Sequence, residues 1–161
     1  MEHLEIERKF LVRSEAYKVQ ASTQTTMAQG FLNTHPERTV RVRIVGDKGF
    51  LTVKGASNAS GVSRFEWEHQ IPHGEAVNLI DLCEGSIVQK IRYRVNFQGH
   101  IFEVDEFLGE NVGLTVAELE LEHEDQRYGR PSWLGKEITG QTKYYNSQLA
   151  LKPFSLWKKP C

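Results

Sequence analysis

Charged side chains recur at every second position in HLEIERKFLV, the run from residue 3 to residue 12. Glu5, Glu7 and Lys9 alternate there with residues that are apolar or have long aliphatic stems. Because successive side chains of a β-strand point to opposite faces, a strand here directs two carboxylates and an ammonium to one face. Such a face is either the solvated side of an amphipathic strand or part of a site that binds ions of both signs.

The same alternation recurs in six further runs along the chain. They are TVRVRIV, FLTVKG, SRFEWEHQI, QKIRYRVNF, IFEVDEF and VAELELEHE, and a less charged eighth run is MAQGFLN. Turn-forming sequences such as GDKG, GASNASG and FQGH separate several of them. The pattern predicts eight β-strands, most of them antiparallel to their neighbours.

The charged positions of these strands form two sets on one predicted face. The cations are Lys9, Arg41, Arg43, Lys54, Arg64, Lys90, Arg92 and Arg94, and the anions are Glu5, Glu7, Glu66, Glu68, Glu103, Asp105, Glu118, Glu120 and Glu122. Like charges two positions apart on one strand lie only about 6 to 7 Å apart and repel each other, most strongly when water is excluded. A face that is merely solvated gives no reason for sorting charges by strand in this way.

Eight antiparallel strands can close into a barrel with either face turned inward. An apolar lumen would give a lipocalin-like cup with the charges outside in water, whereas a charged lumen needs cover for its apolar outer wall. Helical periodicity at 14–20, 74–83 and 139–151, with a short helical turn at 123–129, supplies that cover. We therefore predict a mainly β, α+β fold: a closed eight-stranded antiparallel β-barrel, or tunnel, with a charged lumen and helices packed on the outside. A second subunit could share the cover, which leaves a homodimer open.

Composition limits the class of protein. The 161 residues are 39% hydrophobic and 25% charged, with a formal net charge of −1. These values predict one globular domain spanning 1–161, and the lack of a basic excess argues against a nucleic-acid partner. Without a long apolar run or a secretory signal, we expect no membrane association and a cytoplasmic location. Cys83 and Cys161 lack metal-ligand spacing and the six histidines form no spaced pair, so no zinc site is predicted.

Together the two kinds of charge describe a site for phosphoryl transfer. Converging lysines and arginines suit a polyanion with several phosphoryl groups, because guanidinium groups bind two oxygens at once and ammonium groups neutralise charge. Clustered carboxylates suit Mg²⁺ or Mn²⁺, which prefer oxygen ligands. Such a site needs positioning, charge neutralisation and a metal-activated water, and little covalent chemistry.

The motif Glu5-Ile6-Glu7-Arg8-Lys9 resembles the ExExK signature of the CYTH superfamily, the triphosphate tunnel metalloenzymes. The likeness continues in order along nearly the whole chain, through QGFL, VRVR, LTVKG, FEWE, KIRYR, FEVDEF, AELELE and WLGKEITGQTKYYNSQLA. Within this family, the chain resembles the small bacterial inorganic triphosphatases. The resemblance implies an eight-stranded antiparallel tunnel in which basic residues bind a triphosphate and acidic residues hold a divalent metal, Mg²⁺ or Mn²⁺.

The resemblance also implies roles for particular residues. The implied phosphate ligands are Lys9, Arg41, Arg43, Lys54, Lys90 and Arg92, with help from Arg64. The implied metal ligands are Glu5, Glu7, Asp105, Glu118 and Glu120. The expected catalytic group is Glu5, Glu7, Lys9, Lys90 and Glu120. Charge balance in a cationic lumen and direct catalysis both remain open for Glu66, Glu68, Glu103 and Glu122.

Three positions depart from the family pattern. Phe31 stands where the family often has tyrosine, and Gln141 and Lys143 stand where it often has aspartate and arginine. We expect the C-terminal segment that carries the latter two to plug or flank one mouth of the tunnel. Trp133 and Trp157 match no motif, and we expect them to cover the apolar outer wall or a subunit interface.

Three functions are compatible with these residues. The preferred one is a divalent-metal-dependent hydrolase, in which a metal-activated water attacks the terminal phosphate of inorganic triphosphate or of a nucleoside or organic triphosphate. One alternative is a class IV-type adenylate cyclase, which needs an adenine specificity that no residue here indicates. The other is a non-catalytic protein that binds polyphosphate or nucleotides in the same tunnel.

Overall fold

The computed structural model describes residues 3–157, in which β-structure dominates; Cys161 lies outside them. The strands are β1 (Leu4–Val12), β2 (Thr23–Asn33), β3 (Arg38–Val45), β4 (Lys48–Ser57), β5 (Ser63–Ile71), β6 (Glu84–Phe97), β7 (His100–Phe107), β8 (Thr115–Glu120) and β9 (Leu134–Glu137). The α-helices are α1 (Tyr17–Gln20), α2 (His73–Ile80) and α3 (Asn146–Leu151), and the 3₁₀ helices are η1 (Gly109–Asn111), η2 (Thr142–Tyr144) and η3 (Phe154–Leu156). No helix within 3–157 is long and apolar enough to cross a membrane.

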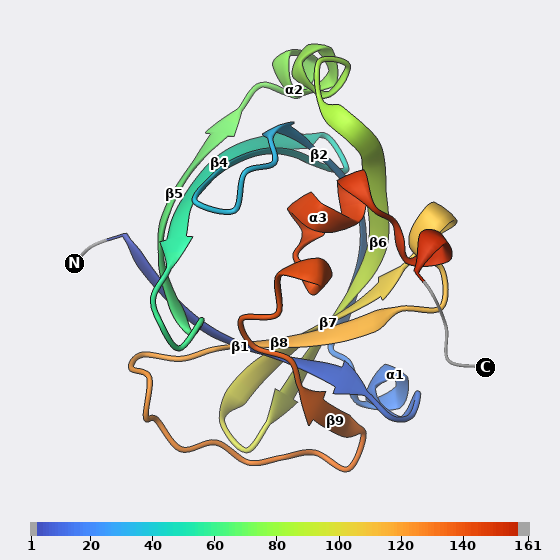
Figure 1. Ribbon diagram of the computed structural model, residues 1–161. Helices are drawn as coiled ribbons and strands as arrows, with labels where there is room; N and C mark the ends of the chain where they lie inside the picture. Colours follow the sequence, from blue (N-terminus) through green and yellow to red (C-terminus); the bar gives the residue numbers. More distant parts are fainter. Residues whose placement is uncertain (1–2, 158–161) are drawn as a thin grey trace.

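Strands β1 to β8 close into an antiparallel barrel, whose ring is seen in Figure 1. Their order around the ring is β5-β4-β3-β2-β6-β7-β8-β1. The ring closes where β1 pairs with β5, with Leu4 opposite Phe65 and Glu5 opposite Arg64. The predicted eight-stranded antiparallel barrel is therefore confirmed.

Strand β9 is a short element that the sequence pattern did not predict. It pairs with the end of β1, where Phe10 lies opposite Glu137. Strand β8 pairs with the other edge of β1, whereas β5 pairs with β1 only as far as Ile6. Strand β9 thus supplies partners for the edge of β1 that β5 no longer covers, which satisfies backbone groups near the barrel seam.

One hydrophobic core lies on the outer wall of β6, β7, β8 and β1. Phe10 and Phe102 are fully buried there, beneath α1 and the segment that leads into β9. Trp133 is also fully buried, with its ring 5.6 Å from that of Phe102 and 6.0 Å from that of Tyr17. Its indole Nε1 donates a hydrogen bond to Gln20 at 3.0 Å. The prediction that Trp133 covers the outer wall is confirmed.

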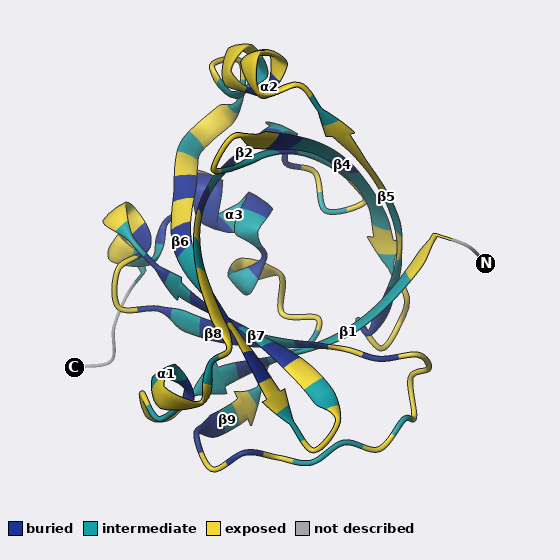
Figure 2. Cartoon of the chain, turned by 180° about the vertical axis from the view of Figure 1, so that it is seen from behind, coloured by how far each residue is buried: buried dark blue, intermediate teal, exposed yellow. Residues whose placement is uncertain are grey.

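A second core lies inside the barrel and closes one end of it. Val88 and Phe107 lie two residues from Lys90 and Asp105 on β6 and β7, so they share the inward faces of these charged residues. They belong to one buried cluster with Leu149 of α3. Figures 1 and 2 show α3 within the ring. This differs from the prediction that helices pack on the outside, but it agrees with the expectation that the C-terminal segment plugs one mouth of the tunnel. The inward-facing residues at this end of the barrel are apolar, and packing an apolar side of α3 against them removes both surfaces from water.

Helix α2 packs on the outside of β2, β3 and β4, as predicted. Its Ala76 is fully buried, and a Cβ atom added to Gly49 of β4 would lie only 2.5 Å from the Ala76 Cβ. The absence of a side chain at Gly49 therefore allows this close approach. The short turn predicted at 123–129 is present as a single hydrogen-bonded turn, in which the Gln126 N–H donates to the His123 carbonyl at 3.2 Å. One predicted detail is wrong: β8 ends at Glu120, so Glu122 is an exposed residue beyond the strand.

Candidate active site in the barrel lumen

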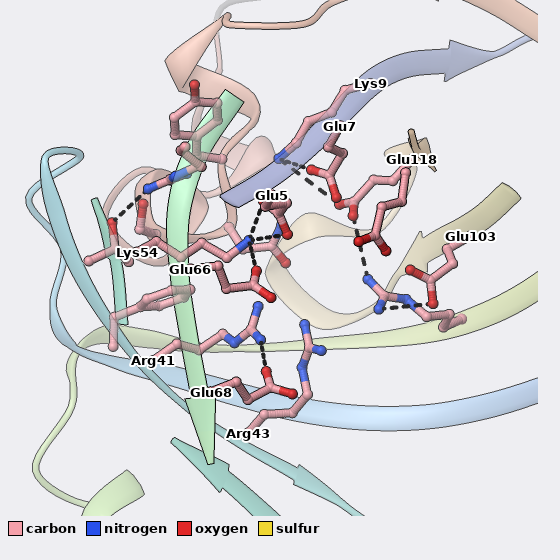
Figure 3. Close-up of a pocket in the computed structure, with 18 of the residues that line it drawn as sticks. Glu5, Glu7, Lys9, Arg41, Arg43, Lys54, Glu66, Glu68, Glu103 and Glu118 are labelled. Carbon is pink, nitrogen blue, oxygen red and sulfur yellow. Dashed lines mark hydrogen bonds and ion pairs between the residues drawn. The ribbon is translucent and has the colours of Figure 1, made fainter. Parts of the chain in front are cut away.

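The inward faces of the strands enclose a cavity of about 180 Å³, shown in Figure 3. The residues predicted to bind phosphate or metal line this cavity, with the exception of Asp105. Glu66, Glu68 and Glu103 line it as well. The charged lumen is thus confirmed, and the lipocalin-like alternative is excluded.

Strand register explains why these side chains meet. Glu7 of β1 lies opposite Glu120 of β8, and Lys9 lies opposite Glu118. Residues directly opposite each other in antiparallel strands project from the same face of the sheet. Since Glu5 shares the face of Glu7 and Lys9, the ExExK run directs all three of its charges into the lumen.

Lys54 forms the centre of one ion-pair group. Its Nζ lies 3.1 Å from carboxylate oxygens of both Glu5 and Glu66. Burial alone would raise the pKa of Glu5, but Lys54 lowers it to about 2. Burial and the neighbouring Glu5 raise the pKa of Glu66 to about 7. One ammonium therefore compensates only one of these two carboxylates fully, and Glu66 retains a proton near neutral pH.

Glu7 and Glu118 form a second group with Lys9. The Lys9 Nζ lies 3.8 Å from Glu7 and 4.0 Å from Glu118. Burial, Glu118 and Glu5 raise the pKa of Glu7 well above its usual value. Burial opposes ionisation of Glu118 as well, but Lys9 and Arg92 lower its pKa. This part of the lumen also carries more carboxylates than its cations compensate.

Asp105 lies behind the cavity wall rather than on it. It is fully buried and accepts hydrogen bonds from Arg92 Nε at 2.7 Å and Arg92 Nη2 at 2.8 Å. The Lys90 Nζ lies 2.8 Å from Asp105 Oδ2, the oxygen that also accepts the hydrogen bond from Arg92 Nη2. Both carboxylate oxygens of Asp105 are therefore occupied by cations, and the residue orients Lys90 and Arg92 toward the lumen. Its predicted role as a metal ligand has no support in this geometry.

Lys90 has an unusual protonation state among the lumen cations. Its side chain is 1% exposed. Burial, reinforced by Arg92 and Arg43 and opposed by Asp105, lowers the pKa of Lys90 to about 7. At neutral pH its Nζ can therefore either hold or release a proton.

The arginines of the lumen are fixed by neutral partners as well as by carboxylates. Arg41 Nη2 donates to Thr52 at 3.0 Å and lies 3.1 Å from Glu68. Arg43 Nε donates to the fully buried Gln29 at 2.8 Å. Fixed guanidinium groups lose less conformational entropy when they bind an anion.

Arg64 differs from the other lumen arginines in its partners. Its Nε donates to the Gly55 carbonyl at 3.1 Å, and its Nη2 donates to the Pro36 carbonyl at 3.3 Å. Although Arg64 lines the cavity, these backbone contacts engage two of its three guanidinium nitrogens. The structure therefore gives it a weaker claim to substrate than Arg41 and Arg43, in keeping with the assisting role predicted for it.

Several lining residues were missed by the sequence analysis. Tyr145, Asn146 and Ser147 bring the start of α3 to the cavity. The Tyr145 ring lies 4.8 Å from Lys9 Nζ and 5.3 Å from the Arg64 guanidinium, distances at which cations and aromatic faces attract. Gln29, which does not line the cavity but accepts the hydrogen bond from Arg43, could have been found, since it shares the inward face of Phe31. The α3 residues belong to the family-like run WLGKEITGQTKYYNSQLA, but no site role was predicted for them, because their placement depends on how the C-terminal segment folds back.

The three positions that depart from the family pattern lie in different places. Phe31 is buried and lines the cavity, so it offers an aromatic edge where a tyrosine would offer a hydroxyl. Gln141 and Lys143 are exposed. Lys143 Nζ lies over the rings of Tyr144 and Trp157, at 5.1 and 4.8 Å. Trp157 therefore covers the C-terminal segment and not the cavity.

The donor set of the lumen fits a hard divalent cation in its chemistry. Carboxylates dominate it, and burial together with neighbouring carboxylates raises the pKa of Glu7, Glu66 and Glu120. A bound divalent ion would compensate the negative charge of these groups when they ionise. Within 3–157, however, no three Asp, Glu, His or Cys side chains converge as a ready-made ligand set. A metal would draw these carboxylates together.

The fold and the site define a class, the closed antiparallel β-barrel with a lumen of opposed lysine, arginine and glutamate side chains. Residues 3–150 match the CYTH domain, and the chain belongs to this family.

Two curated relatives are similar along nearly their whole length. An inorganic triphosphatase of Acetivibrio thermocellus is 46% identical over 156 residues, which cover 96% of this chain and 98% of the relative. An inorganic triphosphatase of Nitrosomonas europaea is 36% identical over 155 residues, covering 91% and 97%.

Solved structures agree with this assignment. The crystal structure of an inorganic triphosphatase is similar with a TM-score of 0.64 and 33% identity, over 91% of this chain and 97% of that one. A protein from Pyrococcus horikoshii is similar with a TM-score of 0.60 over 75% and 80% of the two chains. At 20% identity the latter shows the fold alone.

Proposed function

We propose that this CYTH-domain protein is a divalent-metal-dependent hydrolase that cleaves the terminal phosphate of inorganic triphosphate. The observation that carries the proposal is the lumen itself. Cations from five strands, β1, β3, β4, β5 and β6, surround one cavity. A linear polyphosphate has charged oxygens along its whole length, so such a cavity can bind it throughout. The names of both curated relatives support this substrate.

The cavity favours inorganic triphosphate over nucleotides. Its only aromatic linings within the described residues are Phe31 and Tyr145. Tyr145 already faces Lys9 and Arg64, and Phe31 is 2% exposed, so neither offers a ring face on which a base could stack. Base recognition normally uses such stacking together with placed hydrogen-bond partners.

The chain's own residues hold the substrate and neutralise its charge. We assign phosphate binding to Lys9, Arg41, Arg43, Lys54, Lys90 and Arg92, with Arg64 assisting from the cavity edge. Their positions are fixed before substrate arrives, so charge that develops in the transition state meets donors that need no reorganisation. Lys90, with a pKa of about 7, can hold or accept a proton at its Nζ near the reacting phosphoryl group.

Glu5, Glu7, Glu118 and Glu120 are the residues that would hold the metal, which we propose to be Mg²⁺ or Mn²⁺. When bound, such an ion neutralises phosphate charge and activates the water that attacks the terminal phosphate. We assign Asp105 to orienting Lys90 and Arg92 instead. Glu5 and Glu7 lie on the strand that also carries Lys9, so β1 provides residues for both metal binding and phosphate binding.

One assay tests this function against its alternatives. Purified protein is incubated with Mg²⁺ or Mn²⁺ and either triphosphate or ATP, and the products are separated. Orthophosphate and pyrophosphate from triphosphate support the hydrolase, and both should disappear when a chelator is added. Cyclic nucleotide from ATP would instead identify a cyclase, and binding without turnover would identify a sensor.

Three further expectations stay predictions. We propose that 1–161 is a single domain of the CYTH type, which the match over 3–150 supports. We also retain the predicted cytoplasmic location and leave the homodimer open.

A further inference from the structure

Helix α3 begins at the floor of the cavity, and its first residue contacts two buried lumen side chains. Asn146 Oδ1 accepts a hydrogen bond from Gln29 Nε2 at 2.8 Å and another from Lys90 Nζ at 2.9 Å. Gln29 is fully buried, and Lys90 is 1% exposed. Helix α3 and the segment that leads into it close this end of the barrel, and we call them the C-terminal plug. The plug is therefore hydrogen-bonded to inward-facing side chains of β2 and β6.

The orientation of the Asn146 amide follows from these partners. Arg43 Nε can only donate, so it must face the Gln29 oxygen, which leaves Gln29 Nε2 as the atom that meets Asn146. Because Gln29 Nε2 also only donates, it must meet the Asn146 oxygen. The Asn146 Nδ2 consequently points away from both donors, and within 3–157 it makes no hydrogen bond although Asn146 lines the cavity.

The surroundings show what this amide group could bind. The inner core of Phe31, Val88, Phe107 and Leu149 closes the barrel beside it, so the cavity has a floor. A linear polyanion that enters the opposite mouth ends at this floor, next to Lys90 and Arg43. A phosphoryl group there carries several acceptor oxygens, and a neutral N–H donor can bind one of them without adding charge to a wall that already contains several cations.

We propose that Asn146 is a substrate-binding residue, whose Nδ2 donates to the phosphoryl group at the closed end of the cavity while its Oδ1 holds Lys90 and Gln29 in place. This inference rests on the proposed function, because it takes an inorganic polyphosphate as the ligand. It makes the C-terminal plug a part of the substrate site rather than only a seal.

Metal-free binding of triphosphate, measured by calorimetry, tests the inference separately from catalysis. Asn146→Ala should weaken binding about ten- to a hundredfold, since a hydrogen bond to a charged group is lost. The matched control is Gln148→Ala on the same helix, which removes the hydrogen bond from Gln148 Nε2 to the Thr34 carbonyl at 2.8 Å and lies outside the cavity lining. This control should change binding by less than about twofold, because it loosens the plug without touching the site.

Two further variants separate a contact to substrate from a structural role. Asn146→Asp keeps the acceptor for Lys90 and Gln29 but loses the donor, so triphosphate binding should stay as weak as in Asn146→Ala. In a Lys90→Ala background, Asn146→Ala should still weaken binding several-fold, because the Nδ2 contact does not act through Lys90.

Three results would overturn the inference. They are wild-type binding by Asn146→Asp, equal losses in Gln148→Ala and Asn146→Ala, and no effect of Asn146→Ala in the Lys90→Ala background. If the wild-type protein binds triphosphate without hydrolysing it, the proposed hydrolase fails and the Asn146 inference stands. If it binds no triphosphate, both fail.

Discussion

Arg92 and Asp105 face each other across β6 and β7 and form two parallel hydrogen bonds, at 2.7 and 2.8 Å. A fork of this kind fixes the guanidinium plane as well as its position. Because Lys90 shares the same carboxylate, one buried anion orients two lumen cations. The positions of Lys90 and Arg92 thus depend on Asp105, which does not line the cavity.

The first prediction concerns this buried anion. Asp105→Asn removes the nearest counter-charge of the buried Lys90 and Arg92, so the free energy of unfolding should fall by about 3–5 kcal/mol. Burial lowers the pKa of Lys90 to about 7, and the charge of Asp105 opposes this effect. The substitution should therefore lower the pKa of Lys90 further. Triphosphate binding should then be lost at a lower pH than in the wild type. Urea unfolding and the pH dependence of binding check the two effects, and an unchanged stability would contradict them.

The second prediction concerns Arg41 and Arg43, two of the residues to which we assign phosphate binding. Arg41→Ala and Arg43→Ala should each weaken triphosphate binding or turnover by about 2 kcal/mol or more, because each removes a charge-assisted contact. The matched control is Arg94→Ala, which removes an exposed arginine from the same face of β6 outside the cavity lining. Kinetics at sub-saturating substrate compare the three variants. A folded Arg41 or Arg43 variant with wild-type kinetics would show that the residue does not contact the substrate.

The third prediction concerns pH and metal. Glu66 has a pKa raised to about 7 in the folded protein, so between its ordinary value and pH 7 the folded state holds a proton that the unfolded chain has released. The stability of the metal-free protein should therefore fall as the pH rises through this window. A divalent ion competes with that proton, so Mg²⁺ affinity should rise over the same window.

Thermal unfolding from pH 5 to pH 8, with and without Mg²⁺, measures both trends. Glu66→Gln cannot ionise, so both pH dependences should be weaker in this variant than in the wild type. Identical slopes in the two proteins would assign the titration to another group, with Glu7 the next candidate because its pKa is also raised.

Period-two alternation predicted the barrel and the facing of its charges, because the pleat of a strand fixes which side chains share a face. It could not predict depth along that face. Glu103 and Asp105 lie two residues apart on the same face of β7, yet Asp105 is fully buried behind the cavity while Glu103 lines it. Depth depends on the stagger and closure of all the strands, which no single run of sequence contains.

The C-terminal segment was expected to plug or flank one mouth of the tunnel, but the burial of α3 inside the barrel was beyond prediction for a related reason. The helical pattern around Leu149 was visible, but its burial inside the barrel depends on Val88 and Phe107, which are distant in sequence. Gln29 and Asn146 carry no charge, so they did not enter the count of sorted charges that pointed to the lumen. The role of these neutral amides can be recognised only from the structure, in which Asn146 Oδ1 lies 2.8 Å from Gln29 Nε2 and 2.9 Å from Lys90 Nζ.

The last prediction concerns Glu7, the middle charge of the ExExK run. Burial, Glu118 and Glu5 raise its pKa well above the usual value, which favours the protonated form of Glu7 in the metal-free protein. Glutamine resembles a protonated glutamate in shape and charge. Glu7→Gln should therefore leave folding and metal-free triphosphate binding nearly unchanged, while it removes a carboxylate that a divalent ion would need. We expect kcat to fall by about 100-fold or more at any metal concentration.

Lys9→Ala is the matched variant on the same strand face. It removes a cation that we assign to phosphate, so it should raise the KM for triphosphate and weaken metal-free binding. It also removes an ammonium that helps to lower the pKa of Glu118, so that pKa should rise. Steady-state kinetics against metal concentration, paired with calorimetry of triphosphate binding, separate the two residues. Unchanged activity of Glu7→Gln at limiting metal would mean that Glu7 serves only to balance charge, and the metal would then have to be held by Glu5, Glu118 and Glu120 alone.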